Sequence, residues 1–204
     1  MDDQVLSATR RSLHAVAEQL LAGPQHRTQG TIRLRISPGG FAQVAGPWRV
    51  EGGELVGPDL RVPLTGTVAD VAEAAGVEAG APSIYSDHAD LTDGAPLAVD
   101  PDAAAALADW FARGDAGLRA FAPDEEPVLW PEHFDLGIAV DEVNYGISPG
   151  DTDHATPYAY VGPWTQREGP FWNADFGSVC DADQLPDAEA VAAYFGAGRQ
   201  AAAI

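Results

Sequence analysis

The stretch LWPEHFDLGIAVD, residues 129–141, alternates strictly from its histidine onward. Its even-numbered positions from there carry phenylalanine, leucine, isoleucine and valine, whereas the odd-numbered ones are polar or small. A period of two predicts a β-strand with one apolar face toward a core. His133 and Asp135 then share the other face, with roughly 6.5–7 Å between their Cα atoms. Gly137 and Ala139 leave that face open to a ligand, a helix or another backbone.

Strand patterns and tight turns recur on both sides of this stretch. Residues 30–37 alternate, with Arg33 and Arg35 on the face opposite the aliphatic side chains, and a Pro-Gly-Gly turn follows. Residues 48–56 have the pattern of a β-hairpin around a Gly-Gly turn. Residues 157–164 predict a further strand rich in aromatic side chains. Residues 144–154, between the strands, are expected to form a loop.

Helix signals surround these strands. Residues 3–22 have an apolar stripe at helical spacing and end at Gly-Pro. A Thr-x-x-Asp capping box predicts a helix over 67–75, Asp-Pro at 100–101 starts a long one, and Leu-Pro-Asp at 185–187 starts the last. Two glycines in the long helix are expected to weaken or bend it. About four helices packed on antiparallel β-structure predict an α+β fold, as one domain spanning residues 1–204.

The domain is expected to contain an N-terminal helix plus β-meander, central helices, and a C-terminal β-segment and helix. On the first helix His14 lies at the edge of the apolar stripe, and Ser12 and Glu18 lie off it. We expect His14 to be a partly exposed helix histidine. Residues 76–100, rich in glycine, proline and aspartate, are expected to form a loop.

The charge balance limits the partners of the chain. Its formal net charge is −20, and its sequence contains arginine but no lysine. Such a chain repels nucleic acid and anionic membrane surfaces, so we expect neither as a partner. The sequence has no apolar run of bilayer length, no signal-peptide pattern, and a single cysteine, Cys180, which we expect to be inert. These features favour a cytoplasmic protein.

Aromatic residues with polar tips concentrate between residues 130 and 176. Side chains of this kind build either the wall of a pocket or a core. We predict a small-molecule-binding protein with an aromatic-lined pocket in this segment, and two arginines that hold an anionic group of the ligand. The predicted ligand-binding residues are Trp130, His133, Asp135, Tyr145, Tyr158, Tyr160, Trp164, Trp172, Arg33 and Arg35.

A second interpretation is a metal-dependent hydrolase or lyase. His133, Asp135, Asp153 and His154 carry imidazole and carboxylate groups that ligate divalent cations, and a bound cation activates water by lowering its pKa. Aspartates of this loop are equally typical of Asx turns, so the sequence leaves open whether the protein is an enzyme. A third interpretation is a protein–protein interaction module whose aromatic residues form an interface.

Two further patterns carry less weight. Residues 85–90 place Asp87, His88 and Asp90 in one short loop, which is a weaker candidate for cation binding. Residues 146–150 spell Gly-x-Ser-x-Gly, the pattern of the hydrolase nucleophile elbow. That pattern is rejected because Pro149 follows the serine and has no N–H to donate to an oxyanion.

Several motifs stand out along the chain: GTIRLR with PGGF at residues 30–41, LWPEHFDL at 129–136, NYGxSPGD at 144–151, residues 157–164 and FWN at 171–173. In these motifs the chain resembles a family of uncharacterised proteins from high-GC Gram-positive bacteria. The resemblance extends from end to end of the chain and implies a single intact domain. The family has no assigned activity, so the resemblance implies no catalytic residue and no cofactor. A second actinobacterial domain family of unknown function is more distantly similar around residues 134–136 and the later His/Asp loop.

Overall fold

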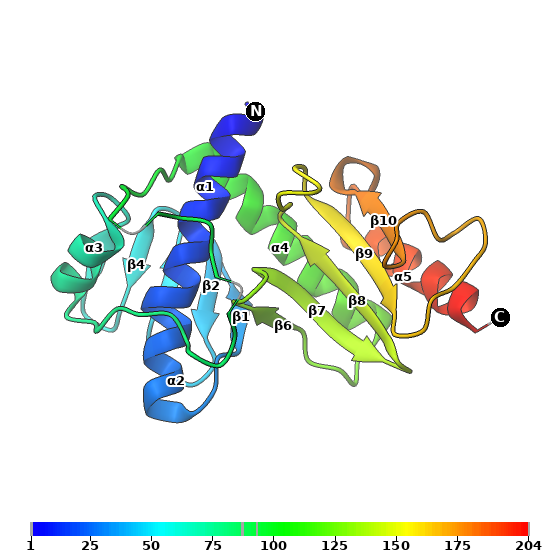
Figure 1. Cartoon of the computed structure of the whole chain (residues 1–204), viewed down its shortest axis with the longest axis horizontal. Coiled ribbons are helices and arrows are strands. Elements are labelled where there is room, and N and C mark those ends of the chain that lie inside the picture. Colours follow the sequence, from blue (N-terminus) through cyan, green and yellow to red (C-terminus); the bar gives the residue numbers. More distant parts are fainter. Residues whose placement is uncertain (1, 87, 93, 204) are drawn as a thin grey trace. The chain divides into compact units, whose positions relative to one another are not determined.

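The computed structural model describes residues 2–86, 88–92 and 94–203. Helices packed with antiparallel strands confirm the predicted α+β class (Figure 1). The chain divides into two compact units. The first unit comprises Met1–Asp109 and Leu129–Phe134, and the second comprises Trp110–Val128 and Asp135–Ile204. Whether the two units fold as one domain stays a prediction.

The first unit contains an antiparallel meander of short strands. Their order is β6-β1-β2-β3-β4-β5, and every neighbouring pair is antiparallel. The Pro-Gly-Gly turn and the Gly-Gly hairpin lie where the sequence predicts them. The strands are β1 (Leu34–Ser37), β2 (Gly40–Gln43), β3 (Arg49–Glu51), β4 (Glu54–Val56), β5 (Arg61–Pro63) and β6 (Val128–Trp130).

The N-terminal helix is longer than the sequence indicates. It runs through α1 (Asp3–Val16), the π-helical segment η1 (Ala17–Ala22) and α2 (Gly23–Gln29) before Gly30 ends it with a left-handed φ of 73°. Pro24 is tolerated because it lies in the first turn of α2. In the π-helical register the carbonyl of Gln19 would accept from residue 24, which has no N–H. The N–H of Gly80 bonds to that carbonyl instead, at 3.0 Å.

Residues 77–100, here called the strap, connect α3 (Val68–Ala75) to α4 (Pro101–Phe121). The strap has no helix or strand among its described residues, as predicted, but it lies along the N-terminal helix. Ser12 Oγ accepts from the N–H of Ala98 at 2.9 Å, and Thr9 Oγ1 accepts from Asp100 at 3.0 Å. Ser12 and Glu18 are therefore buried, at 1% exposure each, although their positions lie off the apolar stripe.

The turn after β6 directs Phe134 into the core of the first unit. Phe134 has a φ of 53° and is 1% exposed. Its ring stacks on His14 and meets Phe41 edge-on, with both centroid distances at 5.3 Å. The strand predicted from His133 onward therefore begins only at Asp135, because a left-handed residue breaks the extended alternation.

The second unit has a four-stranded antiparallel sheet in the order β10-β9-β8-β7. Residues 144–148, predicted as loop, belong to β8, because Val143, Tyr145 and Ile147 alternate into the core. A two-residue turn at Asp141 and Glu142, with φ values of 52° and 61°, joins β7 to β8. The strands are β7 (Asp135–Val140), β8 (Val143–Ser148), β9 (Tyr158–Pro163) and β10 (Ser178–Asp181), followed by η2 (Ala182–Gln184) and α5 (Ala188–Ala202).

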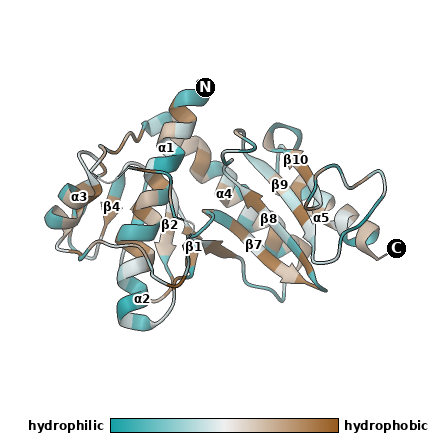
Figure 2. Ribbon diagram, in the orientation of Figure 1, coloured by the Kyte–Doolittle hydropathy of each residue, from teal (hydrophilic) through white to brown (hydrophobic). Residues whose placement is uncertain are grey.

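The part of α4 from Trp110 onward and α5 pack on the apolar face of this sheet. Tyr145 lies in that core, with its ring centroid 4.6 Å from Phe121 and 5.9 Å from Phe195. A Cβ atom on Gly114 would lie 2.5 Å from Ile147, so the expected helix-weakening glycine serves close packing in an unbroken helix. Apolar and polar residues alternate along the strands as coloured in Figure 2. Among the described helices, none has the length and apolar character needed to cross a bilayer.

Candidate functional site

The residues predicted to bind a ligand are divided between the two units. Arg33, Arg35, Trp130 and His133 lie in the first unit and the other six in the second. The guanidinium of Arg33 lies over the Trp130 ring, 5.7 Å from its centroid. The His133 side chain is 59% exposed, with Nε2 3.6 Å from a carboxylate oxygen of Glu132. Within the first unit these residues form a cation–π pair and an exposed histidine.

The polar face of the second sheet is filled at its centre by a tyrosine. Strand register places Gly137, Gly146 and Tyr160 in one row across β7, β8 and β9. A Cβ atom would come within 3.1 Å of the Tyr160 hydroxyl at Gly137 and within 2.4 Å at Gly146. The face left open by small residues is therefore covered by Tyr160. The Tyr160 hydroxyl donates a short hydrogen bond to Asp135 Oδ2.

A second tyrosine on the same face anchors the loop after β8. Tyr158 donates to Asp151 Oδ2 at 2.6 Å. The other oxygen of Asp151 accepts from the backbone N–H groups of Asp153 and His154, at 2.8 and 2.7 Å. This is the Asx turn that the sequence offered as an alternative to cation binding.

The His154 side chain bonds to Asp181 at the end of β10 and to Thr156 in its own loop. Its Nε2 lies 2.6 Å from Asp181 Oδ1 and 3.1 Å from Thr156 Oγ1. A nucleophilic triad needs its carboxylate and its hydroxyl on opposite nitrogens of the imidazole. Here both groups contact Nε2, so Thr156 is not arranged as an activated nucleophile.

The structure does not gather the predicted cation ligands. Within the described ranges, no group of three or more His, Cys, Asp or Glu side chains is placed to hold a metal ion. His133 lies in the turn before β7, and His154 pairs with Asp181. Asp87, of the weaker candidate loop, lies outside the described residues. Burial, and then Asp181, raise the pKa of the Cys180 thiol, as expected for an inert cysteine.

All five tyrosines of the chain hold their protons more tightly than usual. Burial is the largest cause of the raised pKa in each, and a neighbouring carboxylate adds to it in Tyr158 and Tyr160. The tyrosines are Tyr85, Tyr145, Tyr158, Tyr160 and Tyr194.

These raised pKa values predict how the protein unfolds in alkali. Tyrosines of an unfolded chain ionise near pH 10. A group that binds its proton more tightly when folded contributes stability below that pH, and this contribution is lost as the pH rises from there toward the pKa of the folded state. Tyrosinate absorbance should therefore rise together with loss of far-ultraviolet circular dichroism. A gradual rise near pH 10 with unchanged dichroism would contradict the burial of these hydroxyls.

Two hollows of the second unit lie in or beside the segment that the sequence singled out. They share Pro163 and Arg167, and their volumes are about 130 and 260 Å³. We call the smaller the arginine hollow and the larger the tryptophan hollow. The side chains of the arginine hollow include Asp141, Glu142, Tyr145, Thr165, Arg167 and Arg199. Those of the tryptophan hollow include Gln166, Arg167, Glu168, Trp172, Asp175 and Phe176.

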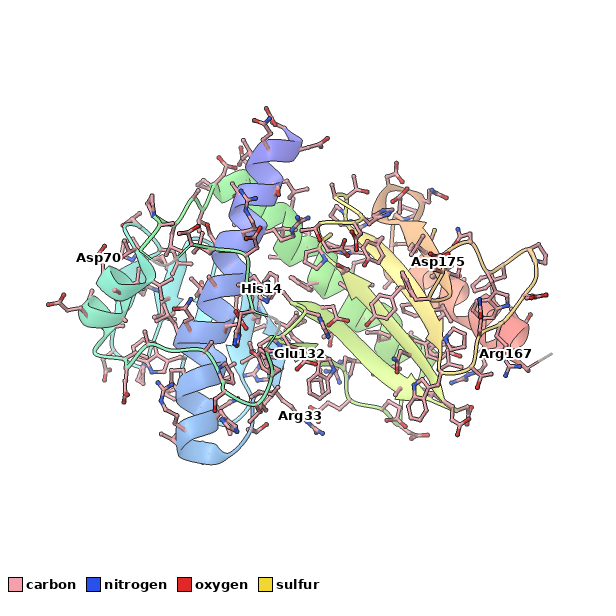
Figure 3. All side chains as sticks on the ribbon, in the orientation of Figure 1. His14, Arg33, Asp70, Glu132, Arg167 and Asp175 are labelled. Atoms are coloured by element: carbon pink, nitrogen blue, oxygen red, sulfur yellow. The ribbon has the colours of Figure 1, made fainter. Side chains whose placement is uncertain are left out.

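Arg167 is exposed, and it has no hydrogen bond or ion pair with any of the described residues. The guanidinium of Arg199 lies 4.1 Å from the centroid of the Phe121 ring. The backbone near Trp172 is held because Asn173 bonds to both the N–H and the carbonyl of Val179. Figure 3 labels Arg167 and Asp175, which both line the tryptophan hollow.

Trp172 and Tyr145 are predicted from the sequence as ligand-binding residues, whereas Arg167 and Arg199 are not. Arg167 is a single basic residue in an irregular loop, and Arg199 lies in the last turn of α5. Neither position belongs to a motif, and only the fold brings them to one hollow. Comparisons with models of protein families, with curated proteins and with solved structures found no match.

Proposed function

We propose that the protein binds a small organic monoanion with a flat apolar ring at the two hollows that share Arg167. One observation carries the proposal. Arg167 is a cation without a carboxylate partner among the described residues, in a chain with 31 acidic side chains. An unpaired arginine beside exposed aromatic rings is suited to a ligand that brings its own carboxylate.

The walls of the tryptophan hollow supply the apolar part of the site. Trp172 is half-buried, and Phe176 is 54% exposed. A flat ring that lies against them buries apolar surface and can pack edge-on or offset against an aromatic side chain. A volume of about 260 Å³ is just below the roughly 300–1,000 Å³ of pockets for drug-sized ligands. We therefore expect a ligand with a single ring.

The charged lining sets the preference for one negative charge. Arg167 and Arg199 offer two guanidinium groups to an anion near the boundary of the hollows. Four carboxylates also line the hollows and would repel a second negative charge on the ligand: Asp141 and Glu142 in the arginine hollow, Glu168 and Asp175 in the tryptophan hollow. All these groups are near solvent, so binding should weaken as ionic strength rises.

Benzoate is the probe that tests this proposal, with benzyl alcohol and benzylamine as neutral and cationic counterparts. We expect benzoate to bind with a Kd on the order of 1 mM, about −4 kcal/mol, and to shift the indole N–H resonance of Trp172. Arg167→Ala should weaken benzoate binding about 10- to 100-fold, because a hydrogen bond to a charged group contributes about 1.5–3 kcal/mol. Titration followed by nuclear magnetic resonance measures both.

Arg35→Ala is the matched control, since Arg35 is also exposed and also has no ion pair with the described residues. It should leave benzoate affinity unchanged. If Arg35→Ala removes binding and Arg167→Ala does not, the anion site is the one expected from the sequence at Arg33 and Arg35. Equal affinity for benzoate and benzylamine would also refute the proposal.

A further inference from the structure

A buried carboxylate lies in the π-helical segment of the first unit. Glu18 is 1% exposed, and both of its oxygens are bonded. Oε2 accepts the backbone N–H of Ala89 at 2.7 Å, and Oε1 lies 3.0 Å from Nδ1 of His88. Both partners belong to the strap, about seventy positions away in the chain. π-Helical turns occur frequently at functional sites.

The contact with Glu18 fixes the chemical character of His88. A carboxylate oxygen only accepts, so Nδ1 of the imidazole carries the hydrogen of this bond. In the neutral ring Nε2 is then the basic nitrogen. The His88 side chain is 42% exposed, so this nitrogen belongs to a ring that solvent reaches. A buried carboxylate that orients an accessible imidazole is the arrangement of a general base.

Tyr85 is a further ionisable group beside this pair. The Tyr85 ring lies 5.1 Å from that of His88, and its hydroxyl oxygen is buried. Burial, followed by the charge of Glu18, raises the pKa of Tyr85, and Glu132 adds to the same effect. Tyr85 therefore stays protonated and uncharged near neutral pH.

Attachment of the strap alone does not require a buried charge. The strap is bonded to the same helix through the neutral hydroxyls of Thr9 and Ser12. Burial of an ionised carboxylate is costly unless the charge is compensated. When His88 takes up a proton, the imidazolium that forms would compensate the charge of Glu18. A neutral hydroxyl at position 18 would attach the strap but would not stabilise that imidazolium.

We propose that His88 is the general base of a hydrolytic site for small acyl esters, with Glu18 as its positioning residue. Nε2 takes a proton from a water molecule as the water oxygen forms a bond to the acyl carbon. The bond from that carbon to the leaving oxygen then breaks, and the leaving group departs with the electron pair. The imidazolium finally returns its proton to solvent. This site lies in the first unit and is independent of the benzoate site in the second.

Hydrolysis of p-nitrophenyl acetate by the full chain tests the assignment. We expect His88→Ala to lower kcat/KM on the order of 100-fold, as general bases contribute about 10²–10⁴. His133→Ala is the matched control, because His133 is an exposed histidine whose neighbouring carboxylate, on Glu132, is 30% exposed. A wild-type rate no greater than that of His88→Ala, or equal losses in both variants, would overturn the proposal.

The positioning role of Glu18 has a readout of its own. Glu18→Gln should lower kcat more than it raises KM, because a neutral amide stabilises a forming imidazolium less well than a carboxylate does. Nitrogen-15 spectra of the intact wild-type protein guard against a variant that fails to fold. They should show His88 in its Nδ1–H form, and the Nε2–H form would refute the assignment. Benzoate binding is measured separately, so failure of one proposal does not affect the other.

Discussion

Replacement of Phe134 by alanine is expected to lower the free energy of unfolding by about 3–5 kcal/mol. The ring is 1% exposed and lies between His14 and Phe41, which it contacts in two different geometries. Truncation leaves a cavity in the core of the first unit and removes the stacking partner of His14. Alanine also keeps the unfavourable positive φ without the packing that compensates for it. Urea denaturation followed by circular dichroism measures the loss.

Phe176→Ala is the control for this prediction. Phe176 is 54% exposed, so the same truncation should change the free energy of unfolding by no more than about 0.5 kcal/mol. Similar losses in the two variants would show that Phe134 does not occupy a packed core. The two variants make the same chemical change, at a buried ring in one case and at an exposed ring in the other.

Local signals in the sequence predicted much of the fold. Thr67 and Asp70 form the expected capping box, and Asp187 caps α5 by accepting from Ala190. Alternation located β1 and β9, which carry Arg35 and Tyr160. Such signals succeed because caps, turns and strand faces depend on residues only a few positions apart.

The failures arise where a distant segment decides the environment. Glu18 lies off the apolar stripe of its helix, yet a strap about seventy residues further along buries it. Phe134 continues a perfect alternation, yet it turns out of the strand to fill a core built mainly from earlier residues. Periodicity describes one element and contains no information about what later covers it.

The sequence predicted several of the residue types at the candidate site, but it did not predict which of them form hydrogen bonds with one another. The sequence analysis grouped His133, Asp135, Asp153 and His154 because they are close in the chain. In the structure His154 bonds to Asp181, 27 residues further on, and Asp135 to Tyr160, 25 residues further on. Antiparallel register brought those partners together. The register between two strands depends on both of them and cannot be predicted from one segment alone. The hydrogen-bond partners of these acidic residues therefore could not be predicted from the sequence.

A substitution at Gly146, beneath the Tyr160 ring, tests the close packing on the polar face of the second sheet. A Cβ atom on Gly146 would lie 2.4 Å from the Tyr160 hydroxyl, 2.5 Å from its Cζ and 2.7 Å from the Leu136 carbonyl oxygen. Gly146→Ala should therefore displace the ring and break its hydrogen bond to Asp135. Overpacking costs about 1–3 kcal/mol, and loss of a bond to a charged group about 1.5–3. We expect the free energy of unfolding to fall by about 3 kcal/mol, which is less than the sum of the two largest costs, because displacement of the ring relieves the overpacking while it breaks the hydrogen bond.

Gly196→Ala is the opposite case on the same unit. Gly196 lies inside α5, and nothing stands within 4 Å of the position of its added Cβ, so alanine should stabilise the protein by about 1 kcal/mol through helix propensity. In a Tyr160→Ala background, the cost of Gly146→Ala should shrink to the contact with the backbone of Leu136. An undiminished cost there would assign the strain to the backbone and not to the tyrosine. Urea denaturation of Gly146→Ala, Tyr160→Ala, the double variant and Gly196→Ala measures these costs. It shows whether the Tyr160 ring or the backbone of the neighbouring strand requires glycine at position 146.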